Sequence, residues 1–219
     1  MEKKYIIEAL TEWVKLYDKN LANKNVLFIY THQKNKANLS NFNSFDFLET
    51  RFTRGNFQHL TGIQLVGKNG EILKNQSNRF YEKCMNGKLS PKDFIVKNKS
   101  TTILKLKALP MMVNIHKNAK MIGEYDELTK IELKTDKLVG GITVCVGFKK
   151  YKNLYVPNTL LKEDIRKVKL DATRVVVGIC TKEINEDKYR NLTYWNKNYT
   201  LEELHLHEEV WSKISNYFT

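Results

Sequence analysis

One histidine of this sequence stands in a segment whose residue types could support acid–base chemistry. His59 lies in the segment Asn56–Gly62, between apolar residues that can anchor the backbone and before a glycine that allows a sharp exit. An imidazole that titrates near neutral pH can take a proton from a ribose hydroxyl group or give one to a leaving oxygen. His59 is therefore a candidate general base or acid. A buried histidine bonded to a backbone carbonyl group is the structural alternative.

Two further side chains could handle a phosphate group. Lys105 lies on a predicted helix, where its ammonium group could hold a phosphate oxygen and stabilise the charge of a transition state. Lys107 faces another flank of that helix, so at most one of the two lysines shares a groove with His59. Thr159 follows Pro157, where a strand is predicted to end in a rigid turn, and its hydroxyl group could donate to a phosphate. Solvated lysines and a threonine that caps a turn are the structural alternatives.

The other histidines give weaker signals, and we expect neither a metal nor another cofactor. His205 and His207 lie two positions apart on a predicted helix, so their side chains diverge and cannot share a metal ion. His32 and His116 are interpreted as structural residues. The sequence contains no His-Glu-x-x-His or Cys-x-x-Cys motif and no paired Asp cluster. Any cleavage by this chain is therefore expected to proceed without a protein-bound metal.

The positive charge is concentrated in the central part of the chain. The net charge is +13, and residues 45–170 contribute 24 Lys and Arg against 12 Asp and Glu. Such a cationic face suits a polyanion such as RNA, while a basic balance also fits a membrane surface or simple solubility. No stretch approaches the roughly 20 apolar residues that span a bilayer. We expect a cytoplasmic protein without a membrane partner.

No internal repeat or clear linker divides the chain, so we interpret it as one α+β domain over 45–195, the range of the resemblance described below, with two additions. Residues 1–44 are predicted to form a helix, a strand and a mobile loop over 33–44, and residues 196–219 a C-terminal amphipathic helix. Within these parts, helices are predicted over 3–22, 78–85, 101–118 with a break or bend at Pro110, and 200–218, with another helix start at Ser90. Strands are predicted over 26–30, 44–51, 131–133, 141–148, 154–156, 165–170 and 175–181, and a hairpin over 63–74 around an Asn-Gly turn.

The order of several short motifs resembles a phage-associated family of the superfamily that groups barnase, EndoU, colicin and RelE-like nucleases. The resemblance covers roughly residues 45–195 and rests on the His59 segment, then Arg79-Phe-Tyr, then Thr102-Ile-Leu-Lys-Leu, then Tyr155-Val-Pro-Asn-Thr. It implies an α+β fold in which N-terminal helices precede a curved antiparallel sheet with a cleft on its face. A C-terminal helix would follow that sheet here.

Members of that superfamily are typically metal-independent endoribonucleases. They activate the ribose 2′-hydroxyl group for attack on the adjacent phosphate and leave a cyclic phosphate. Carried onto this sequence, the resemblance implies that His59 is the general base or acid, Lys105 the stabiliser of phosphate charge and Thr159 the hydroxyl group that orients the phosphate. The substrate contacts it implies are Arg54, Lys107, Tyr155 and Arg166.

The sequence thus favours a metal-independent ribonuclease-like protein of a phage or mobile element. It would act on RNA, including guide or transfer RNA, in the cytoplasm of a bacterial host as a toxin or host-takeover factor. The alternative is a non-catalytic inhibitor of a bacterial defence complex that binds nucleic acid or protein on the same fold. The terminal helices would then contact that complex, or the acidic C-terminal helix would cover the basic cleft.

Overall fold

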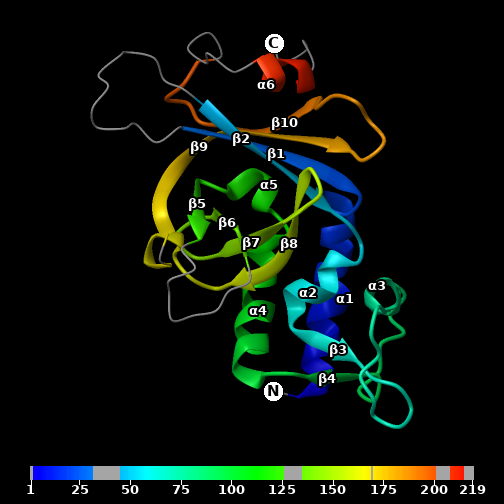
Figure 1. The fold of residues 1–219 in the computed structure, drawn as a ribbon. Helices are drawn as coiled ribbons and strands as arrows, with labels where there is room; N and C mark the ends of the chain where they lie inside the picture. The colour runs from blue at the N-terminus through cyan, green and yellow to red at the C-terminus, as the bar shows by residue number, and fades with distance from the viewer. Residues whose placement is uncertain (1, 32–44, 126–134, 169, 201–207, 215–219) are drawn as a thin grey trace.

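The computed structural model describes residues 2–31, 45–125, 135–168, 170–200 and 208–214 (Figure 1). Its elements follow one another as α1 (Lys3–Asn20), β1 (Lys24–Thr31), β2 (Phe45–Phe52), α2 (Asn56–Thr61), β3 (Ile63–Leu65), α3 (Ser77–Met85), β4 (Phe94–Val96), α4 (Lys99–Met112), α5 (Ile115–Asn118), β5 (Met121–Tyr125), β6 (Lys137–Gly140), β7 (Cys145–Tyr151), β8 (Leu154–Leu161), η1 (Ile165–Lys167), β9 (Leu170–Glu183), β10 (Asn191–Trp195) and α6 (Glu208–Lys213).

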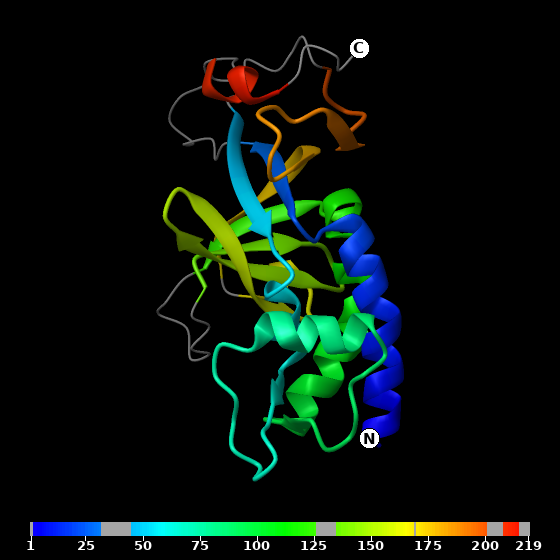
Figure 2. The same cartoon turned by 90° about the vertical axis from the view of Figure 1, so that its right-hand side faces the viewer.

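Apolar residues at spacings of three and four make one face of α1 part of the core. Ile6, Leu10, Val14 and Tyr17 are all buried along this face, as expected for an amphipathic helix. α1 packs against α3 and α4, and Figure 2 shows it beside them, below most of the strands. The Tyr17 hydroxyl group donates a hydrogen bond to Thr53 O at 2.8 Å. This bond ties α1 to the turn that leads into α2.

The eight-stranded sheet closes on itself into a barrel. Neighbouring strands follow the order β1-β2-β8-β7-β6-β5-β9-β10, and β9 also pairs with β1, so the ring from β1 to β9 is complete. β9 closes the ring because its first part pairs with β5 and its second part pairs with β1. β2 and β8 meet in parallel at one residue pair, Thr50 with Tyr155, whereas the other strand pairs are antiparallel. Closure leaves fewer free strand edges than an open sheet would have.

Aromatic side chains from opposite walls meet inside the barrel. Phe28 of β1 and Phe52 of β2 contact Phe148 of β7, with ring centroids 6.4 Å and 5.8 Å apart. β1 and β7 are not neighbours in the ring, so the first of these contacts crosses the interior. The interior at this level is therefore a packed apolar core, filled by alternate residues of each strand.

The mixed α+β class, the N-terminal helix and the described part of the C-terminal helix agree with the sequence analysis. α1, α3, β1 and β2 correspond closely to the predicted elements over 3–22, 78–85, 26–30 and 44–51. The order of elements differs from the implied one, because β1 and β2 precede most of the helices. The expected curved antiparallel sheet is not confirmed, since the sheet closes into a barrel and includes one parallel contact.

Two predictions around β8 and η1 are wrong. β8 does not end at Pro157 but continues to Leu161. The register shifts opposite Gly147 and Phe148, and such a bulge accommodates a residue that has no N–H to donate. Residues 165–167 form the short helix η1 instead of a strand. Asp164 caps this helix, because its side chain accepts a hydrogen bond from Arg166 N.

Further differences arise in the region between α2 and α5. Ser90 begins a turn and not a helix, because its hydroxyl group and N–H both donate to Asp93 Oδ2 before β4 starts. β3 pairs with β4, so the predicted hairpin over 63–74 is reduced to a bridge between Val66 and Ile72. Pro110 lies inside α4, which continues to Met112 before the separate helix α5. The predicted loop over 33–44, the strand over 131–133, His32, His205 and His207 lie outside the described residues.

Candidate active site

The short helix α2 carries His59 and is anchored on both sides of it. Phe57 and Leu60 are fully buried, while His59 is exposed. Asn56, the first residue of α2, accepts hydrogen bonds on its side-chain oxygen from Thr53 N at 2.7 Å and Thr53 Oγ1 at 2.8 Å. Two buried neighbours therefore fix the backbone, and the imidazole remains available at the surface. The alternative of a buried structural histidine does not apply to His59.

Gly62 ends α2 and brings it against α4. Its φ of +75° lies in the left-handed region that favours glycine. A Cβ atom at this position would lie 3.1 Å from Thr102 Oγ1 and 3.4 Å from Lys105 Cδ, both on α4. The Thr102 hydroxyl group donates to Gly62 O at 3.3 Å. The glycine thus permits both the backbone turn and the close approach of the two helices.

Lys105 and His59 are neighbours. Lys105 Nζ donates a hydrogen bond to the backbone carbonyl oxygen of His59 at 3.2 Å. Partial burial and the nearby Lys105 charge lower the pKa of His59, and burial lowers the pKa of Lys105. An imidazole with a lowered pKa is mostly neutral at pH 7, and only the neutral form can accept a proton. The pair therefore combines a proton acceptor with a cation.

His59 lies at the edge of a pocket of about 490 Å³ between α2, β3 and the chain that follows Ile72. Lys74 and Lys97 are the cations among its lining residues. A second pocket of about 580 Å³ shares Leu73 with the first and includes Lys68, Arg79 and Lys92 together with the carboxylate of Asp93. Cations therefore outnumber carboxylates in the lining of these two pockets, as suits the binding of a phosphate chain.

Thr159 comes from β8, on which both α2 and α4 pack. Asn56 of α2 reaches the same strand, since its Nδ2 donates to Pro157 O at 3.5 Å. The elements that carry His59, Lys105 and Thr159 therefore adjoin one another. Thr159 is half-buried opposite Gly147 in the sheet, and a Cβ atom at Gly147 would come within 2.6 Å of its methyl group. Thr159 does not line the His59 pocket.

Arg54 and Lys107 flank this region on different elements. Arg54 precedes α2 and turns toward α1 and α3, because its Nε lies 3.8 Å from Asp18 Oδ1 and its guanidinium carbon lies 5.7 Å from the centre of the Tyr81 ring. Lys107 is exposed on α4. Arg54 is therefore engaged with side chains of α1 and α3, whereas Lys107 is exposed on a different helix.

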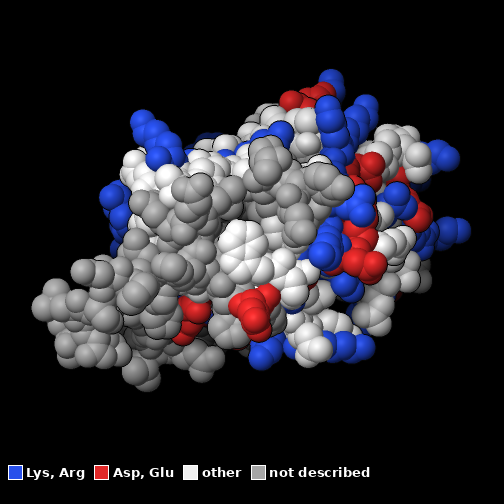
Figure 3. Space-filling model, turned by 90° about the horizontal axis from the view of Figure 1, so that it is seen from above, with Lys and Arg blue, Asp and Glu red and all other residues white. Residues whose placement is uncertain are grey.

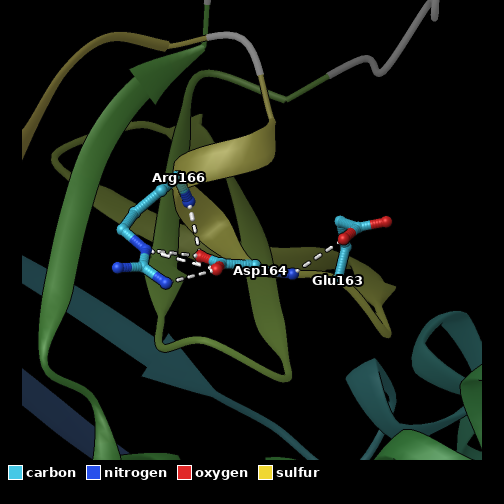
Figure 4. A network of polar contacts seen from close by, with 3 residues as sticks. All are labelled: Glu163, Asp164 and Arg166. Atoms are coloured by element: carbon cyan, nitrogen blue, oxygen red, sulfur yellow. Dashed lines mark hydrogen bonds and ion pairs between the residues drawn. The ribbon is translucent and has the colours of Figure 1, made fainter.

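Arg166 is engaged by an acidic neighbour. Its guanidinium group forms a bidentate ion pair with Asp164: Nη2 donates to Oδ2 at 2.7 Å and Nε donates to Oδ1 at 3.0 Å (Figure 4). The ion pair lowers the pKa of Asp164 to about 2 and raises the pKa of Arg166. η1, which carries Arg166, packs against β5, β6 and β9. The structure therefore does not bring Arg166 to His59.

Tyr155 belongs to a different group of polar side chains that sequence reasoning missed. Lys137 Nζ lies 5.8 Å from the centre of the Tyr155 ring and 3.1 Å from Glu124 Oε1. Arg174 and Tyr30 complete this group with Asp46, and the members come from different strands of the barrel. Each of them is an ordinary strand residue in the sequence, so no local signal marks the group. Only closure of the ring brings the side chains together.

On the surface, cations and acids are mixed. Figure 3 shows several separate groups of Lys and Arg on the face seen from above, with Asp and Glu between some of them. That face does not carry a continuous basic patch over its described residues. Among the described residues, no three His, Cys, Asp or Glu side chains are placed to hold a metal ion together. None of the described helices combines the length and apolarity that crossing a membrane requires.

Comparison with known protein families identifies the family of the chain. A family model described as phage-Barnase-EndoU-ColicinE5/D-RelE like nuclease4 matches residues 9–198. The chain belongs to this nuclease family. The match is longer than the region of resemblance seen in the sequence, because it also includes most of α1 and all of β1, which pack on the parts that follow. No curated protein and no solved structure matches the chain significantly.

Membership of this nuclease family supports a nuclease-like function and the binding of nucleic acid. It also gives His59 and Lys105 a chemical context, because a nuclease must move a proton and stabilise charge at a phosphate. The helices α2 and α4 and the strand β8, which carry His59, Lys105 and Thr159, all lie within the matched range.

Proposed function

We propose that this nuclease cleaves RNA without a metal ion, through attack of the ribose 2′-hydroxyl group on the adjacent phosphate. The observation that carries the proposal is the exposed His59 beside the Lys105 ammonium group, at the edge of a pocket that Lys74 and Lys97 line. The lowered pKa of His59 keeps its imidazole neutral at pH 7, as a general base requires.

In this mechanism His59 accepts the proton of the 2′-hydroxyl group while that oxygen forms a bond to phosphorus. Lys105 stabilises the charge that develops on the phosphate oxygens. The bond from phosphorus to the 5′-oxygen breaks, the leaving oxygen takes a proton from water, and the products are a 2′,3′-cyclic phosphate and a 5′-hydroxyl end. Imidazolium then returns its proton to solvent.

The remaining predicted residues serve the substrate in this proposal. Thr159 orients a phosphate through its hydroxyl group, which requires the substrate to reach β8 from the His59 pocket. Arg54 and Lys107 bind the strand on either side of α2. Tyr155 and Arg166 are more distant substrate contacts, and Arg166 must first release Asp164 to act as one.

The biological role we propose is that of a phage or mobile-element toxin or host-takeover factor that acts on RNA in the bacterial cytoplasm. One observation favours the rival role of a non-catalytic inhibitor of a defence complex. The residues that line the His59 pocket include cations but neither a carboxylate nor a second imidazole. Such a lining is sufficient for holding a polyanion, and the test below separates the two roles.

The test is cleavage of end-labelled RNA in EDTA by the purified protein, with cyclic phosphate ends as the product to be detected. His59→Ala should lower the cleavage rate by about 10²–10⁴-fold and leave RNA affinity nearly unchanged. Lys105→Ala should also lower the cleavage rate, because it removes the cation that stabilises the phosphate charge. Its matched control is Lys99→Ala, which removes an exposed lysine at the start of the same helix α4 and should leave the rate nearly unchanged. Wild-type protein that binds RNA with a steep salt dependence and leaves it intact would establish the inhibitor role.

Expression in a bacterial host tests the biological role. Wild-type protein should slow growth and degrade total RNA, and the His59→Ala variant should do neither at equal expression. Equal toxicity of the two proteins would contradict the role that we assign to His59.

A further inference from the structure

The interior of the barrel changes from apolar to polar toward one end. Residues paired directly across antiparallel strands share a face, and alternate residues along a strand share it too. Tyr30 therefore lies on the same interior face as Phe28. Lys137 pairs with Phe148 and lies on the interior face with it. Phe28 and Phe148 meet inside the barrel. The polar residues one step further along these strands thus form an end layer of the same interior.

The end layer consists of side chains from six strands of the ring. Asp46 pairs with Tyr30, Glu124 pairs with Lys137, and Tyr155 pairs with Thr50, each on the interior face. Arg174 belongs to the same face because it pairs with the buried Ile122. The members of this layer, which we call the barrel-mouth layer, are Tyr30, Asp46, Glu124, Lys137, Tyr155 and Arg174.

The cations of the barrel-mouth layer lie deeper than its carboxylates. The side chains of Lys137 and Arg174 are 16% and 17% exposed, whereas those of Glu124 and Asp46 are 46% and 41% exposed. Lys137 faces Tyr30 and Tyr155, with its Nζ 6.0 Å and 5.8 Å from their ring centres. The layer therefore presents two largely buried positive charges beneath a partly solvated acidic rim.

Arg174 is incompletely satisfied. Its Nη1 lies 3.7 Å from Asp46 Oδ2 and its Nη2 lies 3.9 Å from Glu124 Oε1, both longer than a hydrogen bond. Its Nε is buried without a hydrogen-bond partner among the described residues. A buried donor without an acceptor lowers the stability of the fold. A guanidinium group can bind phosphate oxygens through two parallel N–H···O hydrogen bonds. The site offers donors that an incoming anion would satisfy.

We propose that the barrel-mouth layer binds a phosphate group of a nucleic-acid strand, held by Arg174 and Lys137. The choice of a nucleic-acid strand rests on the proposed function, whereas binding of a phosphate rests on the geometry alone. Asp46 and Glu124 hold the two cations in place before the ligand arrives. Because both carboxylates reach solvent, they move aside as phosphate oxygens take over the contacts. The mouths of β-barrels are common places for ligand sites, and this one is separate from the pocket beside His59.

The first test is an NMR titration of the full-length protein with inorganic phosphate. Arg174→Met should weaken phosphate binding by about tenfold or more, because it removes charge-assisted hydrogen bonds. Glu124→Gln should strengthen it by about threefold, because a repelling charge next to the ligand is lost. Glu183→Gln is the matched control: it makes the same charge change at an exposed carboxylate that pairs with Lys24, and affinity should stay within about twofold.

The second test uses a short fluorescent single-stranded RNA, whose affinity Arg174→Met should lower in parallel while Glu124→Gln raises it. Thermal unfolding of each variant checks that the fold survives, and Arg174→Lys provides a variant that keeps the charge and should retain part of the affinity. The proposal is overturned if wild-type protein and the Arg174 variants bind phosphate equally. It is also overturned if phosphate binding changes and RNA binding does not, because the ligand would then be a free phosphate.

The phosphate-binding test of the barrel-mouth layer and the cleavage test of His59 can succeed or fail separately. Loss of cleavage in His59→Ala with unchanged phosphate binding would support the proposed function and leave the barrel mouth to its own test. Phosphate binding that depends on Arg174 in a protein that cleaves no RNA would support the barrel-mouth site and reject the proposed catalysis.

Discussion

Replacing Gly62 with alanine tests how closely α2 must approach α4. The φ of +75° at Gly62 is a conformation that costs a residue with a Cβ about 1–2 kcal/mol. The new Cβ atom would also lie 3.1 Å from Thr102 Oγ1, so the hydroxyl group that donates to Gly62 O must shift. Loss of that hydrogen bond adds about 1 kcal/mol. We therefore expect Gly62→Ala to lower the free energy of unfolding by about 2–3 kcal/mol.

Gly70→Ala is the matched control for this change. Gly70 has a φ of +83°, but a Cβ atom there would meet nothing within 4 Å. Only the backbone cost of about 1–2 kcal/mol remains. Urea unfolding of both variants, followed by circular dichroism, should therefore show a difference of about 1 kcal/mol between them. Equal losses of stability would refute the idea that helix contact, and not backbone conformation alone, requires a glycine at residue 62.

Three further predictions concern titration and reactivity. Burial, with smaller contributions from Lys117 and Lys24, lowers the pKa of His116 to about 4 from its ordinary 6.5. Between these two pH values the unfolded chain therefore binds more protons than the folded protein. The free energy of unfolding should fall by up to about 3 kcal/mol as pH decreases from 6.5 to 4. Urea unfolding across this range measures the loss, and His116→Gln should flatten it. Lys105→Met should raise the pKa of His59 only part of the way to its ordinary value, because burial is the larger cause of its lowering. An NMR titration that gave a decrease would contradict the proposed proximity of the two charges. Burial raises the pKa of the Cys84, Cys145 and Cys180 thiols to about 12, so a thiol reagent at pH 8 should label them only after denaturation; rapid labelling of the folded protein would show that a thiol reaches solvent.

The sequence was most informative where the spacing of apolar residues within one segment defines the structure. The helical spacing of Ile6, Leu10 and Val14 is sufficient to define α1, because one face of a helix is buried as a unit. The environment of His59 was predictable only in part. Phe57 and Gly62 lie close enough in sequence to fix the local backbone, but the local pattern also suited a buried histidine, and only the structure shows that the imidazole is exposed.

Several errors fall where distant segments decide the outcome, whereas the turn at Ser90 and the helix η1 are set by local contacts with Asp93 and Asp164. Pro157 favours a turn by itself, yet it continues a strand because β8 has a bulge beside it, where β8 has one residue more than β7. The residues after Ile63 contain a good turn, yet β3 takes its partner from β4, about 30 residues further along the chain. Ring closure through β9 cannot be deduced from alternation, since the same pattern suits an open sheet and a barrel.

The two candidate sites depend on the fold in different ways. The His59 site is built from a local segment and one neighbouring helix, and its hydrogen bond from Lys105 needs only the α2–α4 contact. The barrel-mouth layer exists only when the ring is closed, and the β2–β8 seam is held by a single parallel residue pair, Thr50 with Tyr155. Tyr155 is a member of the layer and of that seam. A ligand that binds across the mouth would therefore join strands at the place where the sheet itself has its fewest hydrogen bonds, and this couples occupation of the mouth to the stability of the barrel.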